Sequence, residues 1–237
     1  SSKNIVKLVW KNPVTSCKSL FMECRDIIEI NLTHFNTLSV TNMMYMFYEC
    51  NSLISLDLSN IDTSQVKSMG EMFKNCYSLI SLDVSYFDTS EVENLGTMFH
   101  NCKSLKSLNL SNFKTSKIRY IDNLFGGCMN LISIDLSNFD TSQVIAIHKM
   151  FKDCISLTSL DISHFDIKGI EDMSEIFSNC YLLTSLNISN FITTSATNMN
   201  NMFYNCTSLI YSTTNINSIF AECKNLEYIN IKNYQSN

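Results

Sequence analysis

Residues 72–97 read MFKNCYSLISLDVSYFDTSEVENLGT, and lightly edited copies of this stretch run along most of the chain. Eight cysteines recur at intervals of 26 residues, and a phenylalanine lies three residues before each of them. These cysteines are Cys24, Cys50, Cys76, Cys102, Cys128, Cys154, Cys180 and Cys206. Self-similarity at a fixed period of this length predicts a solenoid in which each copy forms one coil.

Two apolar patterns share each coil. Leu82 and Val84 are two residues apart, which is strand periodicity with both side chains on one face. Val92, Leu95 and Met98 follow at steps of three, a spacing typical of one helix stripe. We therefore predict an α/β coil with one short parallel strand and one short helical segment. Because helices are wider than strands, we expect the stack to curve with its strands on the concave side.

Polar residues separate the two patterns. The triplet Asp88-Thr89-Ser90 recurs as Asp62-Thr63-Ser64 and Asp140-Thr141-Ser142, just before the predicted helical stripe. Short side chains that carry oxygen satisfy the free N–H groups of a helix's first turn. We interpret the triplet as a turn and N-cap, since no catalytic base accompanies its serine.

The repeat also resembles a known family. The pattern LxxLxLxxF with a returning segment resembles a leucine-rich repeat, and the longer form MFxxCxSLxSLDLSNFDTSxVxNM resembles the BspA-like surface-protein repeats of bacteria and protists. Residues 17–209 match coil by coil, with a half-copy at 220–231. The resemblance implies a curved leucine-rich repeat solenoid at an extracellular or cell-surface location, active in recognition or adhesion. It brings no catalytic residues.

Length and charge narrow the function classes. The unbroken repeat predicts a single domain over 1–237, with an N-terminal capping coil at 1–23, regular coils at 24–206, and a truncated coil and C-terminal cap at 207–237. A formal charge of −5 argues against a nucleic-acid partner, which needs a basic stripe. No apolar run approaches the ~20 residues of a membrane span. No secretory signal pattern is present, so secretion is implied by the resemblance alone.

The ten cysteines suggest disulfides or metal at first sight. Parallel Cβ vectors in neighbouring coils would stand about 4.8 Å apart, beyond the roughly 3.8 Å that a disulfide needs. A straight ladder of thiols also cannot converge on a tetrahedral zinc ion. We predict that the cysteines are buried, reduced, small hydrophobic residues. We expect no cofactor and no enzymatic activity, and we interpret His34, His100, His148 and His164 as solvated loop residues.

Two sets of charged residues are candidate ligand-binding positions. Acidic residues stack in the strand column seven after cysteine, and neighbouring pairs could hold a divalent cation; they are Asp57, Asp83, Asp135 and Asp161. Cations gather instead in the coil after Cys102, at Lys103, Lys106, Lys114, Lys117 and Arg119. Of these, Lys106, Lys114, Lys117 and Arg119 are the candidates for binding a sulfated glycan or an acidic protein surface. We call these cations the basic band. The alternative is that the basic band only interrupts repulsion between stacked carboxylates.

Two function classes remain open. One is a non-catalytic recognition or adhesion module with a protein or glycan ligand. The other is a structural spacer or self-assembling array without a specific ligand. The outward strand columns are monotonous, mostly Ser, Asp and Asn, and lack the Trp, Tyr and Arg of binding hot spots. Tyr86, Phe35 and His34 are the residues that disturb the nearby loop columns, and they are weaker candidates.

Overall fold

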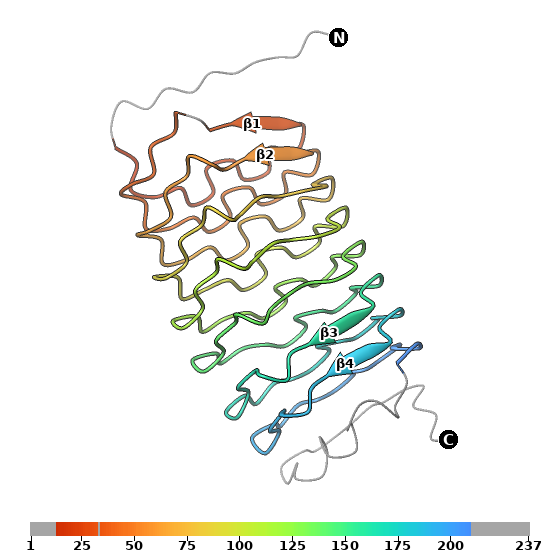
Figure 1. The fold of residues 1–237 in the computed structure, drawn as a ribbon. Helices are drawn as coiled ribbons and strands as arrows, with labels where there is room; N and C mark the ends of the chain where they lie inside the picture. The colour runs from red at the N-terminus through yellow and green to blue at the C-terminus, as the bar shows by residue number, and fades with distance from the viewer. Residues whose placement is uncertain (1–12, 33, 210–237) are drawn as a thin grey trace.

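The computed structural model describes residues 13–32 and 34–209 and shows a stack of similar coils (Figure 1). Four short parallel strands lie on one side of this stack: β1 (Glu29–Asn31), β2 (Ser55–Asp57), β3 (Ser159–Asp161) and β4 (Ser185–Asn187). They form two pairs, β1 with β2 and β3 with β4, each in register one period apart. The predicted 26-residue solenoid is confirmed.

The core is a set of side-chain ladders that run along the stack. The rings from Phe21 to Phe203 lie nearly parallel, with neighbouring centroids 5.4–6.0 Å apart. The described cysteines are free, and all except Cys24 are buried, so the predicted burial is confirmed for the others and wrong for Cys24. Each thiol from Cys50 to Cys206 donates to the backbone carbonyl of the phenylalanine 29 residues earlier, at 3.0–3.2 Å. Cysteine therefore fills a small space and satisfies a buried acceptor.

The predicted helical segment is wrong, because the described residues contain no helix. The segment before each cysteine is a row of turns, with left-handed residues four positions apart, such as Tyr45 (φ 59°) and Glu49 (φ 57°). A right-handed helix needs negative φ throughout. An α-helix is also about 10 Å wide. The phenylalanine rings of this segment stack at about half that spacing, which leaves no room for a helix in every coil.

Hydrogen bonds along these turns alternate between two partners. The N–H groups of Met43, Tyr45, Phe47 and Glu49 donate to carbonyls of the next coil, at 2.8–3.2 Å. Those of Met46 and Tyr48 donate to the carbonyl three residues back in their own coil. The first set links adjacent coils through main-chain bonds, as a sheet does, and it recurs along the stack. The turn side therefore holds the coils close together.

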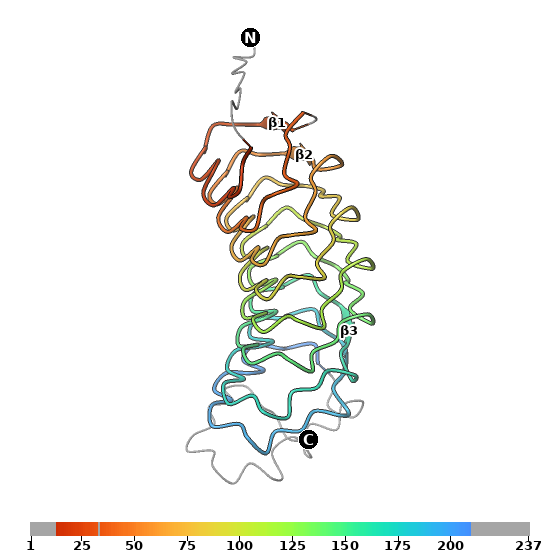
Figure 2. The same ribbon diagram turned by 90° about the vertical axis from the view of Figure 1, so that its left-hand side faces the viewer.

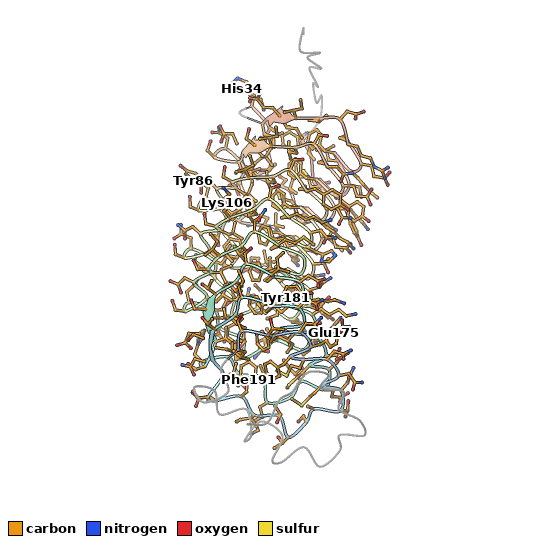
Figure 3. The ribbon with its side chains drawn as sticks, turned by 90° about the vertical axis from the view of Figure 1, so that its right-hand side faces the viewer. His34, Tyr86, Lys106, Glu175, Tyr181 and Phe191 are labelled. Atoms are coloured by element: carbon orange, nitrogen blue, oxygen red, sulfur yellow. The ribbon has the colours of Figure 1, made fainter. Side chains whose placement is uncertain are left out.

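The predicted curvature is wrong in direction. Figures 2 and 3 show a bowed stack with the strands on the outer side of the bend and the turns on the inner side. Between β2 and β3 the corresponding residues 81–83, 107–109 and 133–135 are not paired as strands. Nearby bonds between coils are long, with 3.4 Å from the N of Ile80 to the O of Ile54. The strand side is therefore the more widely spaced one, and a strand in every coil was also a wrong expectation.

The recurring Asp-Thr-Ser triplet links coils and does not cap helices. Thr89 is buried, and its hydroxyl donates to the carbonyl of Lys114 at 3.0 Å and accepts from the N–H of Lys114 at 2.8 Å. Thr115 makes the same pair of bonds with Asp140. The aspartate before each threonine instead closes a local turn, as Asp88 does by accepting from the N–H of Ser90. Only the prediction of a turn is confirmed.

Replacing Thr89 with valine is expected to lower the free energy of unfolding by about 1–3 kcal/mol. Valine has nearly the same shape, so the loss comes from two unsatisfied backbone groups of Lys114. The control is Thr158→Val, because the Thr158 side chain is exposed and its hydroxyl makes one long bond of 3.4 Å, to the carbonyl of Ile132. It should change stability by less than about 0.5 kcal/mol. Urea unfolding of both variants tests this, and equal losses would contradict it.

The ends of the chain are only partly described. Residues 1–12 of the predicted N-terminal cap, with Trp10, and residues 210–237 of the predicted C-terminal cap lie outside the described residues. Within the described part, the model contains no helix of the length and apolar character needed to span a bilayer.

Candidate functional site

The strand face, meaning the exposed residues of the strand columns such as Ser55 and Asp57 in β2, is made of repeated polar turns. The carboxylate of Asp57 accepts from the N–H of Ser59 at 3.0 Å, and Asp83 repeats this with Ser85 at 2.9 Å. Asn109 makes the same bond through its amide oxygen. Asp and Asn alternate in this column because either supplies the acceptor that the turn needs. This column therefore has a structural role in every one of these coils.

Hydrogen bonding also lowers the pKa of these carboxylates. The pKa of Asp57 and of Asp135 is lowered, mainly by the backbone N–H two residues on, and that of Asp161 likewise. For Asp83 the hydroxyl of Ser85 is the main cause of the lowered pKa. Asp161 also receives a bond from the amide of Asn187 at 3.0 Å. Across residues 13–32 and 34–209, His, Cys, Asp and Glu nowhere gather in threes able to hold a metal ion.

The residues of the predicted basic band do not share one environment. Lys114 lies 3.5 Å from Asp88 and Lys117 lies 2.6 Å from Glu91, each one coil earlier in the same column. These ion pairs fit the charge-relief interpretation for Lys114 and Lys117. Lys106 and Arg119 are exposed, and Lys106 interrupts a stripe of exposed isoleucines at Ile28, Ile54, Ile80 and Ile132. The structure therefore does not gather the four candidates into one free cationic cluster.

The loop edge beside the strands carries one shallow hollow next to Tyr86, whose side chain is 59% exposed. Most other coils place asparagine in this column, at Asn60, Asn112, Asn138 and Asn190, and the amide of Asn138 donates to carbonyls of the preceding coil. Figure 3 shows Tyr86 and His34 on the outer side of the bend and Glu175 on the inner side. The acids Asp62 and Asp88 that line this hollow are already bonded to Ser64 and Ser90. Phe35 is buried in the core, so it is not an exposed candidate for ligand binding.

The turn face, meaning the outer surface of the turns such as residues 42–49, differs from coil to coil. The rings of Tyr45 and Tyr48 meet edge to face at 5.8 Å. The ammonium of Lys74 lies 5.5 Å from the centre of the Tyr48 ring and 2.7 Å from Glu71. Burial, followed by the hydrogen bond to Glu71, raises the pKa of Tyr45. Tyrosine pairs of this kind do not occur in the described strands β1 to β4, and this group was missed in the sequence because its positions were assigned to a helix.

Further along this face the residues change again. His100 is partly buried, and its Nδ1 lacks a hydrogen-bond partner among the described residues, as does the buried Oδ1 of Asn123. Burial is the main cause of the lowered pKa of His100. The prediction that all four histidines are solvated is therefore wrong for His100, and His148 is also partly buried. Lys149 and Lys152 both pair with Glu175.

Coils of one period, inward Leu and Phe columns and parallel strands on one side define a leucine-rich repeat solenoid. The model of the family described as "Mycoplasma protein of unknown function, DUF285" matches residues 15–129 and 102–215, most of the chain. The chain belongs to this family. A search of curated proteins finds no match.

A solved structure has the same fold. The leucine-rich repeat protein of T. pallidum (TpLRR) aligns over 85% of this chain and 86% of its own, at 20% identity and a TM-score of 0.57. Leucine-rich repeat proteins of Bacteroides ovatus and Eubacterium ventriosum align over 80% and 81% of this chain, at 20% and 19% identity and TM-scores of 0.44 and 0.46. This chain spans 44% and 55% of those two proteins.

Proposed function

We propose that this chain is a non-catalytic binding module that recognises a protein or glycan ligand through its concave turn face. The observation that carries the proposal is the contrast between the two faces. The strand face repeats the same turn residues in coil after coil, whereas the turn face presents Tyr45, Tyr48 and Lys74 in one region and His100 and Asn123 in another. A face that varies along a rigid stack can be specific for a ligand.

The shape of the molecule supports the same face. The turns lie on the inner side of the bend, so residues from several coils can contact one ligand at once (Figure 2). Tyrosine supplies a large, rigid contact area and is enriched among binding hot spots. The resemblance to BspA-like repeats adds an extracellular or cell-surface location and a role in adhesion to the proposal. Lys106, which is exposed on the outer side of the bend (Figure 3), is a secondary candidate position for docking an anionic group.

A binding assay with labelled chain on cultured cells and on purified matrix glycoproteins tests the proposal. Tyr48→Ala is expected to weaken binding at least tenfold, since truncating a hot spot costs about 2 kcal/mol or more. Tyr86→Ala is the matched control on the outer side, and it should bind as the wild type does. Circular dichroism checks that both variants stay folded.

The alternative function predicts a different outcome. A structural spacer or self-assembling array would show no saturable binding to any surface in the panel, and sedimentation would show growth of assemblies with concentration. Binding that is lost with Tyr86→Ala and kept with Tyr48→Ala would place the ligand on the outer side. Either result would overturn the proposal.

A further inference from the structure

A second hollow lies on the concave turn face, near the middle of the stack. Its volume is about 140 Å³, and its floor is formed by Gly70 and Gly96, which occupy the same position in consecutive coils. Asn94, Thr97, Asp122 and Tyr120 line it together with Met44 and Glu71, and the carboxylate of Glu71 is already paired with Lys74 at 2.7 Å. Drug-sized ligands occupy roughly 300–1,000 Å³, so this hollow fits one small chemical group.

The two glycines are not required by the backbone. Neither has φ in the left-handed region, unlike Gly127 at φ 73°. The local turn does not require glycine either. The same turn, closed by a backbone N–H that donates to the Asn or Asp side chain two residues earlier, forms with other residues at this position. Met44, Ser174 and Asn200 each donate their N–H to the Asx side chain two residues earlier, as Gly96 does to Asn94.

What the glycines provide is space. A Cβ on Gly70 would lie 3.2 Å from the side-chain amide of Asn94, and a Cβ on Gly96 would lie 3.0 Å from a carboxylate oxygen of Asp122. At these distances Asn94 and Asp122 would each have to shift by a few tenths of an ångström to admit the added carbon. The glycines therefore allow Asn94 and Asp122 to lie in the hollow.

The polar groups around the hollow include both free donors and free acceptors. Within the described part of the chain, no bond forms from the amide nitrogen of Asn94, the hydroxyl of Thr97 or the carboxylate of Asp122. Asn supplies N–H donors, a carboxylate supplies acceptors, and a hydroxyl supplies both. The ring of Tyr120, 39% exposed, adds an apolar wall.

This combination discriminates between ligand classes. An ammonium or guanidinium group brings donors only and would leave the amide N–H of Asn94 unpaired. A phosphate or sulfate brings acceptors only and would face the carboxylate of Asp122. A sugar ring carries hydroxyl groups that both donate and accept, and it has an apolar face that can pack on an aromatic ring.

We propose that this hollow is a subsite for a single neutral sugar residue of a glycan ligand. Asn94, Thr97 and Asp122 bond to its hydroxyl groups, and Tyr120 packs against its ring. The inference rests on the proposed function, because it names the ligand class for the same concave face.

Titration of the full chain with methyl glycosides of common hexoses, N-acetylhexosamines and fucose, followed by saturation-transfer NMR, tests the subsite. At least one glycoside is expected to bind saturably with Kd near ~1 mM. Asp122→Ala and Gly96→Ala should each raise that Kd about tenfold or more, a difference of one decade in affinity. The controls are Asp26→Ala, an exposed acid elsewhere, and Gly169→Ala, whose added Cβ meets nothing within 4 Å.

The outcomes separate this proposal from the previous one. If no glycoside binds while the chain still binds cells through Tyr48, the sugar subsite is wrong and the binding function stands. If methylguanidinium or inorganic phosphate binds in an Asp122-dependent way and no glycoside does, the ligand class is wrong. If both hollow variants bind glycosides as the wild type does, the site lies elsewhere.

Discussion

Replacing Phe99 with alanine is expected to lower the free energy of unfolding by about 3–5 kcal/mol, the usual loss for a large buried ring. The ring of Phe99 is fully buried and stacks against Phe73 at 5.8 Å and Phe125 at 6.0 Å. The gap would interrupt the ladder in the middle of the stack, because neighbouring coils are held at fixed spacing by their turn hydrogen bonds. Urea unfolding with an unchanged m value measures the loss.

Phe21 provides the matched comparison. Its ring is 6% exposed and stacks on Phe47 at 5.5 Å, with no second ring contact in the part of the chain that the structure describes. In a solenoid, stability is a sum of coil and nearest-neighbour terms. Phe21→Ala should therefore cost clearly less than Phe99→Ala. Equal losses at the two positions would contradict a nearest-neighbour stack.

The regular period made the core predictable. Cysteine and phenylalanine at fixed spacing have to form ladders when coils stack, and the structure buries both ladders as expected. The thiol bonds to phenylalanine carbonyls could not be read from the sequence, because spacing alone does not show which backbone acceptors lie near a side chain. They explain why cysteine, and not alanine, is kept at this position.

The helical prediction failed because steps of three and four residues are not unique to helices. A row of turns with a left-handed residue every fourth position places the same side chains inward. A signal was present in the column before cysteine, where Asn75, Asn101, Gly127 and Asn179 occur. Glycine and asparagine are the residues that most readily adopt the left-handed region. Read in this way, the column predicts turns.

The error about helices also misplaced the candidate site. With wide helices outside, the strand face would be concave and its Asp column would be the natural place for a ligand. The turns instead bring the coils together on their own side, so the concave face carries Tyr45, Tyr48 and the hollow at Gly96. The Asp column serves the turns of the chain itself, and its replacement by Asn109 in one coil is the signal in the sequence that was not used.

The second large expected effect concerns the buried cysteines: we expect the chain to unfold in mild alkali. Burial raises the pKa of Cys128 and Cys206 to about 12, and it raises the pKa of Cys76, Cys102, Cys154 and Cys180 as well. In the unfolded chain a thiol has a pKa near ~8.5. The folded state therefore keeps protons that the unfolded state releases.

The direction in which the free energy of unfolding changes with pH follows from this difference in proton binding. Below pH ~8.5 both states hold the thiol protons, so stability does not depend on these groups. Above it the unfolded state gains thiolate, and the free energy of unfolding falls by up to about 1.4 kcal/mol per pH unit for each buried thiol. At pH 10 the loss is about 2 kcal/mol for each thiol, or roughly 12 kcal/mol for the six from Cys76 to Cys206. Since domains are stable by only about 5–15 kcal/mol, unfolding is expected by about pH 10.

Urea unfolding at intervals between pH 7 and 10 measures this slope directly. Cys102→Ala should be less stable than the wild type at pH 7, because it leaves a small cavity beside the Phe73 carbonyl that the thiol bonds. Its stability should nevertheless fall less steeply with pH, by the contribution of one proton. The slope separates ionisation from packing, since a packing loss is the same at every pH. Stability that stays flat from pH 8 to 10 would contradict this prediction. It would mean that the thiols ionise in the folded stack as readily as in the unfolded chain.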